Sequence, residues 1–79
     1  MYILESSIRG GETTKKQFEF EVSAFVAMKS DFMEVARMNE LQVATILSGE
    51  DSEPGCEFTT YNASDCASRS FWKIYREND

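Results

Sequence analysis

The sequence predicts an α+β fold in which an antiparallel sheet packs against one helix, in the order β-β-α-β-β-β. Apolar and polar residues alternate near the N-terminus, and aromatic and β-branched residues are frequent near the C-terminus, and both patterns are typical of strands. Between them, apolar residues from Ser23 onward recur at spacings of three and four, as on one side of a helix. A length of 79 residues allows one core, so we expect a single domain over residues 1–79.

The first two strands are predicted to form a hairpin. Residues 2–9 alternate between an apolar and a polar face, and residues 16–22 do so more clearly, because Phe18, Phe20 and Val22 share one face. The segment "GGETT" between them is longer than a two-residue turn, which favours a wider or bulged connection.

A helix is predicted after the hairpin, with Ser23 as its N-cap and Asn39 as its end. A shorter helix starting at Ser30 or Asp31 is the alternative, since "DFME" has the spacing of a capping box. The residues expected on the buried side are Phe25, Met28, Phe32, Val35 and Ala36.

Three further strands are predicted in the second half of the chain. The β-branched segment 41–48 is expected to form the third strand, residues 57–62 the fourth and residues 70–75 the last. Residues 63–69 lack a clear pattern and are expected to form a loop or a single helical turn.

The charge of the chain narrows the choice of partners. Fourteen acidic and eight basic residues give a net charge of −6, and the chain contains no histidine. Such a field repels phosphate backbones and anionic lipid, so we expect no direct nucleic-acid or membrane binding, and basic protein surfaces are the natural counterparts. General solubility is the commoner reason for an acidic composition.

The sequence offers no catalytic, cofactor-binding or metal-binding residues. The absence of histidine removes Ser-His and Cys-His nucleophiles and the commonest metal ligand. The acidic segment "GEDSEPGCE" departs from the calcium-loop pattern, and "GG" at positions 10 and 11 has no Lys-Ser or Lys-Thr in register for a phosphate loop. We therefore expect a protein that is not an enzyme and uses no cofactor.

The sequence also bears on location. The first residues lack the features of a signal peptide, and no apolar run is long enough to cross a membrane, so a cytoplasmic location is expected. In that compartment Cys56 and Cys66 are expected to stay reduced.

Two groups of carboxylates are candidate contacts for a partner protein. Pairing Leu4 with Phe20 would set Glu5 opposite Glu19, and a shift of two residues would set Glu5 opposite Glu21 or Gln17. Because directly opposed like charges destabilise a sheet, this arrangement suggests a carboxylate-bearing outer face, although exposed strand glutamates without a role are more common. The first group is therefore Glu5, Glu19 and Glu21, and the second, in the acidic loop, is Glu50, Asp51 and Glu53.

In size, acidity, lack of catalytic residues and order of elements, the chain resembles small phage-encoded inhibitors of bacterial defence, above all anti-CRISPR proteins. The resemblance covers the whole chain as a class and includes no shared motif, so no residue is carried over. It implies a stoichiometric blocker that occupies a surface meant for DNA or guide RNA in the host cytoplasm.

These observations lead to three hypotheses. The leading one is an acidic, non-catalytic inhibitor that binds the basic surface of a nucleic-acid-handling host complex. The alternative is a small dimeric structural or assembly module, associating through a sheet edge or through exposed aromatics such as Trp72. A small enzyme or ligand binder ranks last.

Overall fold

The computed structural model describes residues 1–49 and 55–78, which form five strands and two helices. The predicted class, an α+β fold with an antiparallel sheet, is confirmed. The order along the chain is β-β-α-α-β-β-β, so a second helix stands where the third strand was expected. The elements are β1 (Tyr2–Ser7), β2 (Thr13–Phe18), α1 (Glu21–Ala36), α2 (Glu40–Ser48), β3 (Cys56–Phe58), β4 (Asn62–Asp65) and β5 (Ser70–Arg76).

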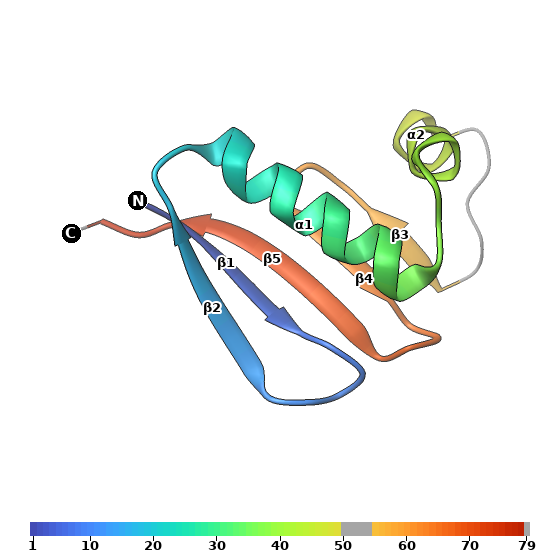
Figure 1. The fold of residues 1–79 in the computed structure, drawn as a ribbon, viewed down its shortest axis with the longest axis horizontal. Helices are drawn as coiled ribbons and strands as arrows, with labels where there is room; N and C mark the ends of the chain where they lie inside the picture. The colour runs from blue at the N-terminus through green and yellow to red at the C-terminus, as the bar shows by residue number, and fades with distance from the viewer. Residues whose placement is uncertain (50–54, 79) are drawn as a thin grey trace.

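The five strands form one sheet in the order β2-β1-β5-β4-β3, with every neighbouring pair antiparallel. The last strand, β5, is central, and it pairs with β1 on one side and β4 on the other. Both termini lie at one end of the sheet (Figure 1), where the amide N–H of Glu77 donates to the carbonyl oxygen of Met1 at 3.0 Å. The sheet therefore requires the start and the end of the chain to meet.

Helix α1 runs across one face of the sheet, and the core lies between these two layers (Figure 1). Met28 and Phe32 are fully buried, which confirms the predicted helical face. The Phe32 ring centroid lies 5.0 Å from that of Phe58 and 5.6 Å from that of Trp72. Trp72 is only 1% exposed, so the expectation that it offers an exposed aromatic contact is wrong.

The hairpin has a different register from the predicted one. Tyr2 pairs with Phe18 and Glu5 with Lys15, a shift of four residues from the pairing of Leu4 with Phe20. The physical reason is that β2 ends at Phe18 and the chain enters α1 at Glu21, so the last residues of the predicted strand are not available to pair.

Helix α1 begins before the predicted N-cap Ser23 and ends before Asn39. Its N-cap is Phe20, whose side chain makes no capping hydrogen bond. The shorter alternative that starts at Ser30 or Asp31 is wrong, because both residues lie well inside the helix. The run of buried residues facing the sheet sets the length of α1 more than capping chemistry does.

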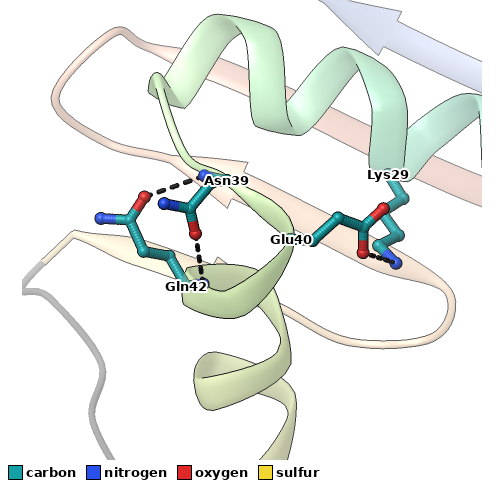
Figure 2. Close-up of polar contacts among 4 residues, drawn as sticks. All are labelled: Lys29, Asn39, Glu40 and Gln42. Carbon is teal, nitrogen blue, oxygen red and sulfur yellow. Dashed lines mark hydrogen bonds and ion pairs between the residues drawn. The ribbon is translucent and has the colours of Figure 1, made fainter.

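Residues 41–48, predicted as a strand, lie in helix α2. Figure 2 shows its capping box: the Asn39 side chain accepts from the backbone N–H of Gln42 at 2.9 Å, and the Gln42 side chain accepts from the Asn39 N–H at 2.8 Å. The helix ends at Gly49, whose φ of 76° is the left-handed conformation that glycine adopts without strain. With both ends capped and Val43 buried, the weak β preference of the segment is overridden.

The last part of the sheet also departs from expectation. The predicted fourth strand, residues 57–62, is shortened to β3, whereas β4 lies in residues predicted as a loop. Ala63 and Asp65 on β4 are buried, and Ala63 pairs with Trp72 on the central strand. Pairing with β5, and not local propensity, therefore makes this segment a strand. The predicted strand 70–75 is confirmed as β5.

The two cysteines differ in exposure. Cys56 on β3 is buried, while Cys66, in the turn between β4 and β5, is exposed. Neither helix of the described chain is long and apolar enough to span a membrane.

Candidate protein-binding site

The three carboxylates predicted to share a strand face are separated in the structure. Glu5 lies in the interior of the sheet on β1, where its Oε1 is 3.7 Å from Nζ of Lys15 on β2 and its side chain is 21% exposed. The predicted opposition of Glu5 to another glutamate or to Gln17 is wrong, because the register places a lysine there. Glu5 is therefore a cross-strand partner of Lys15 and not part of an exposed acidic patch.

Glu19 and Glu21 lie instead where the chain passes from β2 into α1. Glu19 is exposed between the two elements, and Glu21 is the first residue of α1, where a negative charge interacts favourably with the helix dipole. Beside them, Phe20 is 62% exposed and Val22 is 66% exposed. We name these four residues, Glu19, Phe20, Glu21 and Val22, the junction site.

The junction site borders an open pocket of about 400 Å³ at the end of the sheet. A hydrogen bond from the Tyr61 phenol to the Glu21 carboxylate raises the pKa of Tyr61, and the negative charge of Glu21 acts in the same direction. Tyr61 is half exposed, so it adds to the exposed apolar surface beside Glu21. The pocket is lined by Tyr2, Glu21, Tyr61, Ile74, Tyr75 and Arg76.

The exposed apolar surface continues along the outer side of α1. Val26, one helical turn after Val22, is 58% exposed. Val26 lines a shallow groove of about 310 Å³ together with Lys29, Ser30, Met33 and Glu40. At its far side the Lys29 ammonium lies 2.8 Å from Oε2 of Glu40 and links α1 to α2 (Figure 2). Contiguous exposed apolar surface of this kind is typical of a protein-interaction face.

Sequence reasoning placed Phe20 and Val22 on the buried face of a strand and so missed the apolar part of this site. One signal was available, because an acidic residue such as Glu21 is common in the first turn of a helix. The second predicted acidic group, Glu50, Asp51 and Glu53, lies outside the described residues.

The groups at the junction site suit contact with another protein. Within residues 1–49 and 55–78, no three Cys, Asp or Glu side chains come together in an arrangement that could hold a metal ion. The site combines carboxylates, an exposed aromatic ring and an exposed valine, which suits contact with a surface that is both basic and partly apolar. Comparison with protein-family models, with curated protein sequences and with solved structures finds no match for this chain.

Proposed function

We propose that this chain is an acidic, non-catalytic inhibitor that binds the basic surface of a nucleic-acid-handling host complex. The observation that carries the proposal is the junction site, where two carboxylates flank a phenylalanine that is 62% exposed. In protein interfaces, a few central aromatic or apolar anchors supply most of the affinity, while charges set orientation and rate of encounter. Phe20 has the exposure of an anchor, and Glu19 and Glu21 are the charges directly beside it that a bound partner would desolvate.

The sign of the charge selects the partner. A net charge of −6 favours encounter with a basic protein and opposes contact with nucleic acid or with a second copy of this acidic chain. Basic surfaces large enough to accept such a domain are found on proteins that hold nucleic acid. Carboxylates bound there would take the positions of phosphates, so binding alone would block the nucleic acid.

The choice of a defence complex, such as a CRISPR effector, rests on the resemblance to phage-encoded inhibitors in size, acidity and class of fold. We place this inhibitor in the cytoplasm of the bacterial host, where its target acts.

The proposal is tested by capturing the target from bacterial lysate and measuring its affinity for variants. We expect Glu19→Lys with Glu21→Lys to weaken binding by about 2 to 5 kcal/mol, the usual cost of altering charges that are desolvated at an interface. Phe20→Ala should weaken binding by at least about 2 kcal/mol if this residue is the anchor.

The matched control is the double variant Glu12→Lys with Glu34→Lys, which makes the same change of charge at exposed positions away from the junction site. Equal weakening by the control and the junction variant would show that only total charge matters. The proposal would be overturned if the captured protein bound both junction variants, Glu19→Lys with Glu21→Lys and Phe20→Ala, as tightly as it binds the wild type.

The uncovered outer side of α1 favours one other function, a small dimeric assembly module. Val22 and Val26 are each more than half exposed and lie one turn apart, as in a helix that packs against a copy of itself. Sedimentation at two protein concentrations separates the hypotheses, because a module of this kind would be dimeric without any partner and would lose that state in Val22→Ser with Val26→Ser.

A further inference from the structure

The face of the sheet opposite α1 has no second layer of described residues, and its two halves differ. In the half formed by β2, β1 and the end of β5, Ile3 is only 2% exposed although it points away from the core beneath α1. Tyr75 pairs with Ile3, and the pKa of Lys15 is raised first by its electrostatic interaction with Tyr75 and then by hydrogen bonding to the same side chain. The Lys73 Nζ lies 5.5 Å from the centre of the same ring. In this half Ile3 is therefore covered, while Lys15 and Lys73 remain exposed.

The other half, formed by β3, β4 and the start of β5, contains an open hollow of about 210 Å³. Glu57, Ser64 and Phe71 form one row across these three strands, since Glu57 pairs with Ser64 and Ser64 with Phe71. Thr59, from the turn between β3 and β4, and Asn62, the first residue of β4, extend the lining. We name this feature the β4 hollow.

Three polar side chains of the β4 hollow are unused, whereas the Thr59 hydroxyl is hydrogen-bonded to the backbone of Asn62. Among the described residues, the Glu57 carboxylate, the Asn62 side-chain amide and the Ser64 hydroxyl have no hydrogen-bond or ion-pair partner. Phe71 is 40% exposed, and its ring contacts no other ring or cation of the described chain. The hollow thus presents a carboxylate, two further acceptors and an open aromatic face, all without internal partners.

We propose that the β4 hollow binds an arginine side chain of the target protein. A guanidinium is planar, stacks on an aromatic face and donates several hydrogen bonds in its plane. Phe71 supplies the stacking surface, Glu57 the opposite charge, and the Asn62 carbonyl and Ser64 hydroxyl oxygens supply further acceptors. Lys73 also lines the hollow, but its ammonium is directed to the Tyr75 ring, 5.5 Å from the ring centre, which leaves the face of Phe71 to another cation.

The location of the hollow links it to the junction site. The turn between β3 and β4 contributes Tyr61 to the pocket beside Glu21 and Thr59 to the hollow, and Asn62, directly after the turn, also lines the hollow. A partner protein that binds around this turn would therefore contact both the β4 hollow and the junction site. The arginine is assigned to the target on the strength of the function proposed above, because a basic nucleic-acid-binding surface is rich in this residue.

The inference is tested without the target by titrating the full chain with N-acetyl-arginine amide and following backbone amide resonances. We expect shifts confined to residues of the hollow, and about a two- to fivefold loss of affinity in Glu57→Gln, the range for one exposed ion pair. Phe71→Leu should weaken binding by a similar factor, since an exposed cation–π contact is of the same size. Glu12→Gln, which removes an exposed carboxylate elsewhere, is the control and should bind as the wild type does.

N-acetyl-citrulline amide, which has the same shape without the charge, should cause much smaller shifts. Equal shifts with both probes, shifts located elsewhere, or indifference to Glu57→Gln would each overturn the assignment. Shifts of the same resonances that grow with protein concentration alone would show that a second copy fills the hollow, and would also overturn it.

Binding of the captured target separates this inference from the proposed function. If Glu57→Gln leaves target affinity unchanged while the junction variants reduce it, the function stands and the arginine contact fails. If the arginine probe binds but the junction variants do not change the affinity for the target, the arginine site is supported and the proposed function fails.

Discussion

Phe32 connects the two layers of the molecule. It is fully buried in the second half of α1. Its ring packs at a tilted angle against Phe58 on the edge strand β3 and edge-on against Trp72 on the central strand β5. Such aromatic pairs add a geometric preference to the burial of large apolar surface. In a domain of this size, with few large core residues, the burial of one such side chain contributes a substantial part of the free energy of unfolding.

We expect Phe32→Ala to lower the free energy of unfolding by about 3 to 5 kcal/mol, through lost transfer energy and the cavity left between helix and sheet. Denaturant-induced unfolding followed by far-ultraviolet circular dichroism provides the measurement. Val26→Ala, on the exposed side of the same helix, should change it by less than about 0.5 kcal/mol. Unfolding of Phe32→Ala at the wild-type midpoint would contradict the packing described here.

At the scale of elements, α2 shows how short signals at the ends of a segment decide its structure. Its nine residues include Val43, Thr45 and Ile46, which are β-branched and favoured the prediction of a strand. The capping box before it and Gly49 after it satisfy backbone groups that a short helix otherwise leaves open. Buried Val43 and partly buried Ile46 then fix the helix on the core.

Because α2 depends on its first cap, we expect Asn39→Ala to destabilise the protein by about 0.5 to 2 kcal/mol. Hydrogen exchange of the α2 amides should accelerate more than exchange in the sheet, since the lost bond is local. Asn39→Asp retains the acceptor and is the control. An unchanged exchange rate throughout α2 in Asn39→Ala would show that packing of Val43 alone holds the helix.

At the scale of the whole molecule, the charges divide into those used internally and those left for a partner. Glu5 and Glu40 are paired with lysines of neighbouring elements. Glu19 is exposed at the junction site, and the loop acids Glu50, Asp51 and Glu53 add to the negative field from positions outside the described residues. Contacts at fixed geometry are expected to hold a complex, and remote charges to steer its formation.

We therefore expect neutralising Glu50, Asp51 and Glu53 to slow association with the target and to leave dissociation nearly unchanged. The effect should shrink as salt rises, because charges are screened over about 10 Å at 0.1 M ionic strength. Association and dissociation rates measured at low and high salt test this. A faster dissociation at both salt concentrations would instead make these residues direct contacts.

Several features of the fold were predictable from local pattern. Alternation identified β1, aromatic and β-branched content identified β5, and the three-and-four spacing identified the buried side of α1. The acidic charge likewise follows from composition alone. Of the candidate site, Glu19 and Glu21 were predicted to share a strand face with Glu5, whereas the structure places them where the chain passes from β2 into α1.

The remaining features depend on contacts between residues far apart in the chain. The register of the hairpin depends on where β2 gives way to α1, and β4 is a strand because Ala63 and Asp65 are buried beside β5. Local preferences differ by only about 1 kcal/mol between helix and strand, which is less than the burial of one large side chain contributes. The sequence by itself therefore determined the class of fold, the buried side of α1 and the sign of the charge. Only the tertiary structure decided the register, the nature of α2 and β4, and the exposure of Phe20 and Val22, because each depends on which surfaces remain uncovered once sheet and helix have packed.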